Sequence, residues 1–377
     1  MMGFTLVVIH IPSAMSTTVH PPEPVNPTIA EIARQAGVGT ATVDRVINGR
    51  AGVNADTALK VMNIIHASGG NKALARGRPR RSGKAENLRF AFVLPTGQAP
   101  FLALMERQIA QSASEFRHQQ ITEVTHCLDA ADPAEFAANL ALLHGYDGIA
   151  LLGPDLPPLK QAINALVRSG VQVVTLFSDI AGSKRAVYVG CDNRAAGRTA
   201  GLLLGRMAGG GGTADTGRNT LLLASQATRL SGEIERRIGF AQVIEERFAH
   251  LRVLRTPDLP ESNAEAHSVL AAWLGSGGCD TQAVAGLYNV GSGTAGVVAA
   301  VQTLKASNNN IPIVAHDLCD AHRRLLESGV LAYVLAQDIH YCVQSAAKVM
   351  QALCANVRGA IDAVQPRIEI FTAENLY

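Results

Sequence analysis

Residues 28–48, T-I-A-E-I-A-R-Q-A-G-V-G-T-A-T-V-D-R-V-I-N, decide the fold of the first part of the chain. Apolar residues recur at helical spacing as far as Ala36, and Gly37-Val38-Gly39 then interrupts the pattern. Thr40 opens a second helical run, whose apolar face is Val43, Val46 and Ile47. Two short helices joined by a glycine-containing turn predict a helix-turn-helix, whose second helix lies in the DNA major groove.

A third amphipathic run follows, with Ala58, Val61 and Ile65 on one face. The three runs together predict an all-α helix-turn-helix domain over residues 27–71. A three-helix bundle that only packs against a neighbouring domain is the alternative interpretation. We expect residues 1–26 to be a disordered tail or a mis-assigned start, because the apolar stretch 4–11 lacks the basic flank of a signal peptide.

Charge is distributed unevenly along the chain. The whole sequence has a formal charge of +2, but residues 27–84 contain ten Lys or Arg against three acids. This segment therefore carries +7 and leaves −5 for the remainder. Because neutralising phosphates releases counterions, the segment is expected to bind double-stranded DNA. Much of the excess lies in K-A-L-A-R-G-R-P-R-R-S-G-K at 72–84, within residues 72–87, which we assign as a basic hinge or linker.

These features resemble the lac repressor family of bacterial transcription regulators (LacI/GalR). The resemblance rests on A-x-x-A-G-V-x-x-x-T-V-x-R-V-x-N (Ala33 to Asn48), V-N-A-D-T at 53–57 and A-L-A-R at 73–76. It implies a first domain that binds operator DNA. It also implies a second domain that binds a small effector.

The resemblance places base-reading residues at the start of the second helix, at Thr40, Ala41 and Arg45. Arg45 has the chemistry for a bidentate contact to guanine, whereas Ala41 offers only methyl contact with thymine. Asp44 stands where a serine is common in the family, and we expect it to tune which operator is bound. The residues expected to contact the DNA backbone are Thr42, Asn48 and Asn54.

In this family a short helix after the third one enters the minor groove and wedges a leucine between base pairs. Here the wedge position falls on Arg78, and Pro79 follows it. An arginine can sense a narrow minor groove electrostatically, but it does not unstack a base step as an apolar wedge does. We therefore expect minor-groove contact by Arg76 and Arg78 without a strong kink, and Leu74 is the apolar candidate for intercalation.

From Leu88 onward, short apolar runs alternate with amphipathic segments. The predicted strands are 88–94, 148–152, 171–177, 220–224, 283–290, 311–315 and 330–336. The predicted helices are 101–117, 133–144, 157–169, 193–208, 231–248, 294–306 and 319–328. This alternation predicts doubly wound parallel sheets covered on both faces. The length of residues 88–377 suits two lobes, as in the α/β fold of periplasmic binding proteins.

Aromatic and polar side chains follow several predicted strands, where ligands bind in open α/β sheets. Aromatic faces combined with carboxylates and amides suit an uncharged polar ring, so the expected effector is a sugar or polyol. The residues at these positions are Phe101, Asp179, Asp192, Asn289, Asp317 and Gln337. For any one Asp or Asn alone, a turn or helix-cap role is the alternative.

The effector half is similar to periplasmic sugar-binding proteins and to the effector domains of the repressor family. In those relatives the positions matching Phe101, Asn289, Asp317 and Gln337 contact the ligand. The relatives also carry a ligand-clamping arginine five residues before the position of Gly239, where this chain has Ile234. We expect Arg229 or Glu233 to supply the missing polar group.

A competing interpretation rests on Gly291–Gly296, a G-x-G-x-x-G pattern after an apolar strand, with Asp317 at the spacing of a dinucleotide-binding acid. It predicts a nucleotide- or NAD-binding protein or enzyme. No set of residues assembles into a catalytic or metal site, and no cofactor is expected. The six cysteines contain no C-x-x-C, which favours reduced thiols in the cytoplasm. No apolar run reaches membrane-spanning length.

The sequence thus predicts a ligand-responsive transcriptional regulator in the cytoplasm. One helix-turn-helix contacts few base pairs, so we expect a homodimer, or a tetramer built as a dimer of dimers. Ligand is expected to close the two lobes and thereby shift the population of the DNA-binding state.

Overall fold

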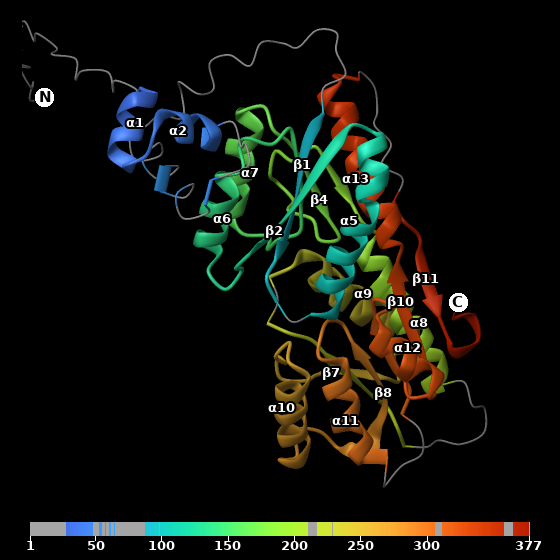
Figure 1. Ribbon diagram of the computed structural model, residues 1–377. Coiled ribbons are helices and arrows are strands. Elements are labelled where there is room, and N and C mark those ends of the chain that lie inside the picture. Colours follow the sequence, from blue (N-terminus) through green and yellow to red (C-terminus); the bar gives the residue numbers. More distant parts are fainter. Residues whose placement is uncertain are drawn as a thin grey trace, which may run out of the picture. The chain divides into compact units, whose positions relative to one another are not determined.

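A computed structural model describes residues 28–47, 53–54, 57, 60–61, 64, 87–97, 99–209, 217–227, 229–305, 311–357 and 365–376 (Figure 1). The chain forms two compact units, Met1–Arg81 and Ser82–Tyr377. Among the positions predicted from sequence, the tail 1–26, Asn48 and the basic-segment residues Leu74, Arg76 and Arg78 lie outside the described residues.

The first unit begins with the two predicted helices, α1 (Ile29–Ala36) and α2 (Thr40–Ile47). A capping box starts α1: the Thr28 side chain accepts from the Glu31 backbone N–H, and the Glu31 carboxylate accepts from that of Thr28 at 2.9 Å. The helix ends at Gly37, whose φ of +70° is left-handed. A glycine adopts this conformation without strain, so the chain turns sharply into α2.

Small apolar side chains hold this unit together. Ile32, Ala33 and Ala36 of α1 pack with Val43 of α2 and with the helical residue Val61 of the third predicted run. Because this side of α2 is buried, the opposite side is left at the surface. Thr40, Ala41 and Arg45 are exposed there.

The second unit contains two sheets. The first has the order β2-β1-β3-β4-β5, and all its pairings are parallel. Its strands are β1 (Leu88–Pro95), β2 (Ile121–Leu128), β3 (Gly148–Leu151), β4 (Gln172–Leu176) and β5 (Val187–Val189). The second has the order β11-β10-β9-β8-β6-β7, and its β10–β11 pairing is antiparallel. Its strands are β6 (Thr220–Ala224), β7 (Arg252–Arg255), β8 (Val284–Asn289), β9 (Ile313–His316), β10 (Tyr333–Gln337) and β11 (Ile368–Phe371).

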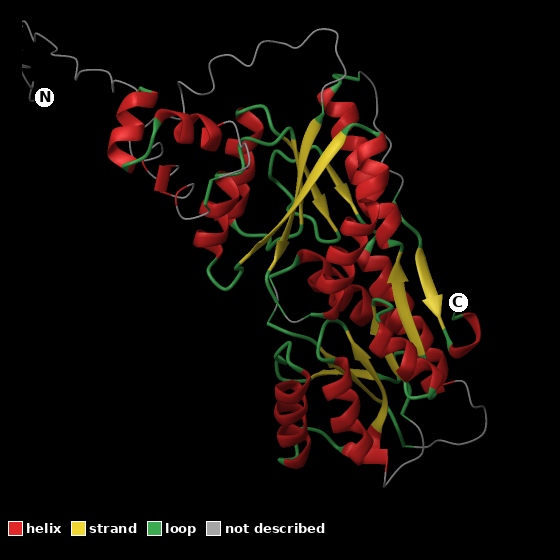
Figure 2. Cartoon of the chain, viewed as in Figure 1, coloured by secondary structure: helices red, strands yellow, loops and turns green. Residues whose placement is uncertain are grey.

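Helices cover both faces of each sheet (Figure 2). On the first sheet, α5 (Pro100–His118) and α13 (Ile339–Cys354) pack on one face, and α6 (Pro133–Ala141) and α7 (Pro157–Arg168) on the other. On the second, α10 (Asn263–Gly275), α11 (Thr294–Lys305) and α12 (Asp320–Glu327) face α8 (Asn193–Gly209) and α9 (Ser231–Arg247) across the sheet. Short 3₁₀ turns occur at Thr281–Ala283 and Ala373–Asn375. The predicted doubly wound, two-lobed fold class is confirmed.

The chain crosses between the lobes three times. It leaves the first sheet after β5, returns after β10 to form α13 on the first lobe, and crosses back to add β11 to the second sheet. Two of these crossings lie side by side, because the Cys191 backbone N–H donates to Gln337 Oε1 at 3.0 Å. Each lobe is therefore built from separate segments of the chain.

Four strands were missed by the sequence analysis, namely β2, β5, β7 and β11, and each lies at the edge of its sheet. Edge strands are covered less completely and need no continuous apolar run, and in β2 only Ile121 is fully buried. Helices α10 and α13 were also missed. The predicted strand 220–224 is confirmed with the same bounds as β6.

Close backbone approach between α8 and α9 generates a first prediction. A Cβ at Gly197 would lie 1.9 Å from the Arg236 carbonyl oxygen, so Gly197→Ala must push the helices apart. We expect a loss of about 1–3 kcal/mol in the free energy of unfolding, measured by urea denaturation.

Gly145→Ala is the matched control, because no atom lies within 4 Å of the added Cβ at that position. It should change stability by less than about 0.5 kcal/mol. Equal midpoints for the two variants would contradict the proposed helix contact.

Candidate functional site

A cleft of about 420 Å³ lies between the two lobes of the second unit. Its walls are formed by residues that follow the carboxyl ends of strands in both sheets, where ligands bind in open α/β folds. The volume falls within the range of about 300–1,000 Å³ that is usual for small-molecule pockets. Four residues predicted from sequence line it: Phe101, Arg229, Glu233 and Asp317.

The wall contributed by the first lobe is mainly apolar. Phe101 and Phe177 meet edge to face, with ring centroids 5.1 Å apart and an interplanar angle of 86°. Phe177 has a φ of +58°, which is unusual for a residue with a large side chain. Its backbone N–H donates to the Val189 carbonyl at 3.0 Å, which holds this conformation. This wall offers aromatic surface to a bound ring.

The wall contributed by the second lobe is polar and contains a buried ion pair. Arg236 Nη1 lies 4.0 Å from Asp317 Oδ2, and the two side chains are only 9% and 18% exposed. Burial opposes the charge of the guanidinium, but nearby anionic groups, Asp317 first, leave the pKa of Arg236 raised. Burial raises the pKa of Asp317, and Arg236 works against that rise.

Arg236 was missed by the sequence analysis. The ligand-clamping arginine was expected at position 234, but the structure places a cationic side chain in the cleft two residues later on α9. The spacing offered a signal, because positions 233 and 236 share one face in the first turns of a helix. Both side chains line the cleft.

Arg236 also connects the cleft to the first lobe. Its Nε donates to Asn193 Oδ1 at 2.8 Å, and Asn193 Nδ2 donates to the Phe177 carbonyl at 3.0 Å. The chain of contacts thus runs from Asp317 in one wall to the backbone of Phe177 in the other. A displacement of Arg236 would therefore disturb contacts in both walls of the cleft.

Asp317 has a φ of +64°, in the left-handed region. Its carbonyl accepts from His322 Nδ1 at 2.6 Å and from the Cys319 backbone N–H at 2.9 Å. Its own N–H donates to the Leu335 carbonyl at 2.8 Å. These bonds hold a strained residue at the end of β9, and such strain is concentrated at functional sites.

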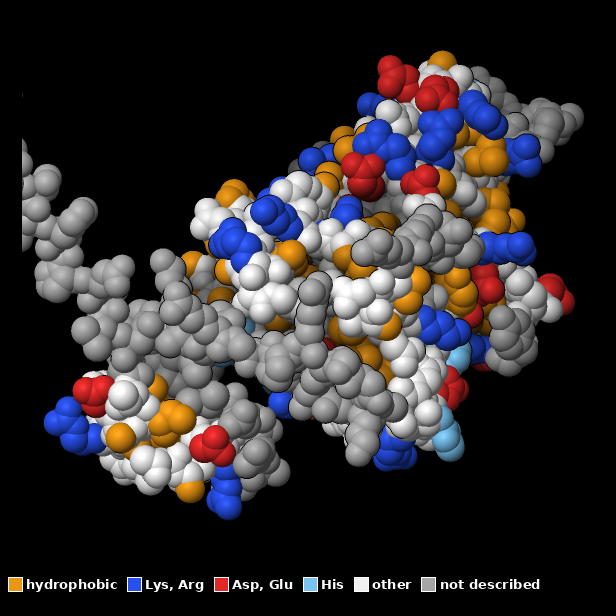
Figure 3. Space-filling view, turned by 90° about the horizontal axis from the view of Figure 1, so that it is seen from above, with side chains coloured by type: hydrophobic (Ala, Val, Ile, Leu, Met, Phe, Trp, Pro, Cys, Tyr) orange, Lys and Arg blue, Asp and Glu red, His pale blue; other side chains and the backbone are white. Residues whose placement is uncertain are grey.

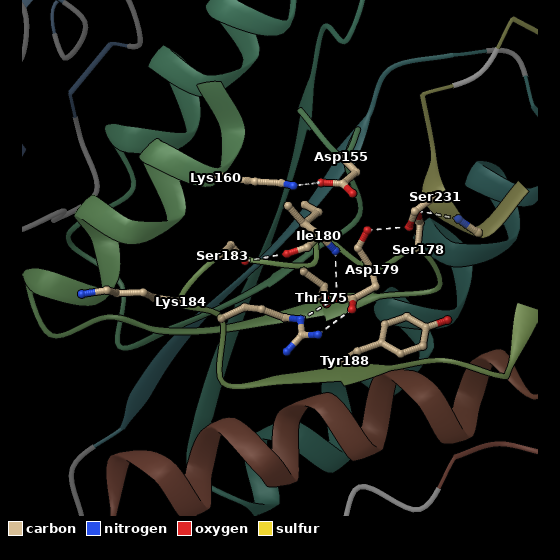
Figure 4. A network of polar contacts seen from close by, with 12 residues as sticks. Asp155, Lys160, Thr175, Ser178, Asp179, Ile180, Ser183, Lys184, Tyr188 and Ser231 are labelled. Atoms are coloured by element: carbon tan, nitrogen blue, oxygen red, sulfur yellow. Dashed lines mark hydrogen bonds and ion pairs between the residues drawn. The ribbon is translucent and has the colours of Figure 1, made fainter. Parts of the chain in front are cut away.

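Two predicted acids do not line the cleft. Asp179 accepts hydrogen bonds from Arg185, from the Thr175 hydroxyl and from the Ile180 N–H (Figure 4). Burial works to raise the pKa of Asp179, but these bonds outweigh burial and lower it. Asp192 instead caps α8, since its Oδ1 accepts from the Ala195 N–H at 2.9 Å. Asp179 is thus held mainly by its ion pair with Arg185, whereas Asp192 has the helix-cap role that was the alternative for a single Asp.

Two predicted amide residues form hydrogen bonds to the backbone near the cleft. The Asn289 side chain is buried, and its Nδ2 donates to the carbonyls of Gly291 and Ser292 and to Thr294 Oγ1. It therefore shapes the loop that lines the cleft. Gln337 is buried at the lobe crossings, where its Oε1 accepts from Cys191. Neither lines the cleft.

Hydrogen bonds beside the cleft connect the start of α9 to the first lobe. Ser178 Oγ lies 3.2 Å from Ser231 Oγ and accepts from the Gly232 N–H at 3.2 Å (Figure 4). The Asp155 N–H donates to the Arg229 carbonyl at 3.0 Å. The start of α9 is therefore fixed relative to the aromatic wall.

The Gly291–Gly296 loop meets the cleft at its first residues. A Cβ at Gly291 would lie 2.2 Å from Gln226 Oε1 and 3.2 Å from Glu233 Oε2, so a side chain there would displace the end of the Gln226 side chain. Gly296 has a different role, since a Cβ there would lie 1.9 Å from the Asn263 carbonyl of α10. The glycine pattern serves close packing at both points.

The candidate nucleic-acid interface lies on the first unit. Thr40, Ala41, Arg45 and Asn54 are exposed, and Thr42 and Asp44 are partly exposed. Figure 3 shows both basic and acidic side chains on the part of this unit that the structure describes. The exposed face of α2 is thus not buried in the hydrophobic core of this unit.

Within the described ranges, no group of three or more His, Cys, Asp or Glu is arranged to hold a metal ion. No helix among the described residues has the length and apolar character needed to cross a membrane.

Comparisons with known families match both units. Residues 28–69 match the bacterial regulatory proteins of the lacI family, and residues 90–357 match the periplasmic binding protein domain. A search of curated protein sequences finds no significant match.

Solved structures share the fold of the second unit. GanP, a glucose-galactose binding protein from Geobacillus stearothermophilus, is 19% identical with a TM-score of 0.65, covering 78% of this chain and 99% of its own. An ABC transporter solute-binding protein from Burkholderia graminis, in complex with D-arabinose, is 17% identical with a TM-score of 0.68, covering 78% and 98%. A protein from Bacteroides fragilis described as a LacI transcriptional regulator is 16% identical with a TM-score of 0.65, covering 77% and 98%.

At these identities the solved structures establish the fold alone, and the family matches establish the relationship. The chain belongs to the lacI family of bacterial regulatory proteins, with a helix-turn-helix domain followed by a periplasmic binding protein domain.

Proposed function

We propose that this regulator binds operator DNA with an affinity that a sugar or polyol controls from the cleft. The observation that carries the proposal is the cleft itself, which combines an aromatic wall with a polar wall in a chain that also has a helix-turn-helix. The similar structures described with glucose-galactose and D-arabinose support this effector class.

Operator recognition is assigned to the exposed side of α2. Arg45 donates to guanine in the major groove, and Ala41 contacts a thymine methyl group. Thr42, Asn48 and Asn54 contact the backbone, and the basic segment with Leu74, Arg76 and Arg78 contacts the minor groove. A homodimer or tetramer in the cytoplasm places two such domains on a two-fold symmetric site.

Effector control follows from the way the lobes are joined. A ligand that contacts both Phe101 on the first lobe and Asp317 on the second binds the closed form more tightly than the open form. The crossings held by Gln337 and Cys191 are where the backbone can hinge. The ligand therefore shifts the population of lobe arrangements and with it the affinity for DNA.

The alternative of a nucleotide or NAD ligand is disfavoured by charge. Glu233 Oε2 lies close to Gly291 at the start of the glycine loop, and Glu261 and Asp317 also line the cleft. Glu233 and Glu261 would repel a phosphate placed at that loop, and the nearby Arg236 is already paired with Asp317. No separate observation favours an enzymatic reaction.

Arg45→Ala should lose specific operator binding. Loss of one bidentate base contact is worth about 1–3 kcal/mol, or roughly 5- to 150-fold in Kd. The measurement is fluorescence anisotropy at fixed salt, on a duplex that the unaltered protein selects from a random library.

Arg34→Ala serves as the control, because Arg34 is an exposed arginine on α1 rather than α2. Equal losses in the two variants would show that Arg45 contributes only general charge.

Asp317→Asn should abolish stabilisation by the effector. A ligand at a hundred times its Kd adds about 2.7 kcal/mol to the free energy of unfolding, which a thermal-shift screen of sugars and polyols detects. The control is Asp192→Asn, the same substitution at a helix cap outside the cleft. Asn caps a helix about as well as Asp, so this variant should keep the shift. Retention of the full shift by Asp317→Asn would place the effector elsewhere.

A further inference from the structure

Glu233 has an unmet hydrogen-bonding requirement inside the cleft. It lies in the first turn of α9 and lines the cleft, and its Oε2 is buried with no hydrogen-bond partner among the described residues. A buried acceptor without a partner loses its hydration without compensation, at a cost of about 1–3 kcal/mol, and more for a charged group. A ligand that donates a hydrogen bond to Glu233 would remove this cost.

The protein's own cations do not satisfy this carboxylate. The buried Arg236 is already engaged by Asp317, by Asn193 Oδ1 and by the Val290 carbonyl. Arg229 lines the cleft but is exposed to solvent. Burial, opposed in part by Arg236 and reinforced by Asp317 and Glu261, raises the pKa of Glu233 to about 7. Arg236 and Arg237 favour a negative charge at Glu233 through space, but among the described residues no cation forms an ion pair with its carboxylate.

The surroundings of Glu233 leave room for a ligand. Gly291 stands beside it, and a Cβ there would lie 3.2 Å from Oε2, so the glycine leaves space next to the carboxylate. The Gln226 side chain packs against the same glycine. Its Nε2 is also buried without a hydrogen-bond partner among the described residues. Because Gln226 does not line the cleft, the group that a ligand meets here is the Glu233 carboxylate, which suits a cationic donor on a compound that also carries hydroxyl groups.

We infer that the effector is a small polyhydroxy compound bearing a protonated amine, of the amino-sugar class, and that Glu233 binds its ammonium group. The inference rests on the proposed function, in which the cleft is the effector site. The ring lies on Phe101 and Phe177, and the amine faces α9. Glu233 is thereby a specificity-determining residue that favours the amine over the parent sugar.

Binding of the ammonium requires the ionised carboxylate, which gives the affinity a defined pH dependence. Affinity should rise between pH 6 and pH 7 as Glu233 loses its proton, with at most about a tenfold change per pH unit. Toward pH 8 the rise should stop, because the ammonium group of the ligand then begins to lose its own proton. The other titratable groups facing this region are Asp317, Glu261, His316, Cys319, His322, Arg229, Arg236 and Arg237. Burial lowers the pKa of His316 well below its usual range, so this side chain stays neutral across the window. His322 has a raised pKa despite its burial, and its titration is common to all variants.

The test compares matched ligands on the full chain. D-glucosamine is measured against D-glucose and N-acetyl-D-glucosamine, and D-galactosamine against D-galactose, by thermal shift and calorimetry at pH 6, 7 and 8. We expect the free amines to bind at least tenfold more tightly than their neutral partners, with affinity rising from pH 6 to pH 7.

Glu233→Gln should remove this preference and its pH dependence. The variant should fold, because the substitution removes an unpaired buried charge, and its melting temperature without ligand should equal or exceed that of the parent at pH 8. Glu235→Gln is the matched control on the same helix, where the carboxylate pairs with Arg194 away from the cleft. It should retain the amine preference.

Three results would overturn the inference: neutral sugars that bind as tightly as amines, an amine preference that survives Glu233→Gln, or no amine-dependent stabilisation in either pair. The proposed function has a separate readout, the operator affinity in the presence of the bound ligand. An amine that binds through Glu233 but leaves operator affinity unchanged would support the inference and contradict the regulatory proposal.

Discussion

The second unit depends on the burial of one charge, the guanidinium of Arg236. A buried cation is tolerated only when its donors are occupied and an anion lies nearby, and Arg236 meets this requirement through Asn193, the Val290 carbonyl and Asp317. These partners come from the start of α8, the end of β8 and the end of β9. Satisfying one side chain thus fixes the relative positions of several segments, and Asn193 extends the connection to Phe177 in the first lobe.

The charged and the aromatic side chains of the cleft come from different lobes. The charged groups belong to the second lobe, where α9 brings Glu233 and Arg236 to one face, while the first lobe offers Phe101 and Phe177. A ligand bound at the proposed site would therefore contact an aromatic surface on one side and hydrogen-bonding groups on the other. Because neither wall alone can satisfy such a ligand, binding energy is available for bringing the lobes together, and a regulator of this architecture can use that energy to change its affinity for DNA.

The fold was largely predictable from sequence because central parallel strands are buried on both faces and require continuous apolar runs. The Leu-rich strand β6 was predicted with its observed bounds. The edge strands β2, β5, β7 and β11 were missed because an edge position imposes a weaker pattern. Of the predicted ligand-binding residues, Phe101, Arg229, Glu233 and Asp317 line the cleft. By contrast, Asp179 pairs with Arg185 and Asp192 caps a helix.

The sequence by itself determined the two-domain architecture, since helical periodicity around Gly37 and the strand–helix alternation after Leu88 are local properties of the chain. It also determined that Arg45 is exposed, because the opposite side of its helix carries the apolar residues. Only the tertiary structure decided which polar residues meet in the cleft. Arg236 and Asp317 are 81 positions apart, and whether Asn289 or Gln337 faces a ligand or a neighbouring backbone depends on contacts between distant segments. Such contacts form only when the chain packs into its tertiary structure, so no local sequence pattern predicts them.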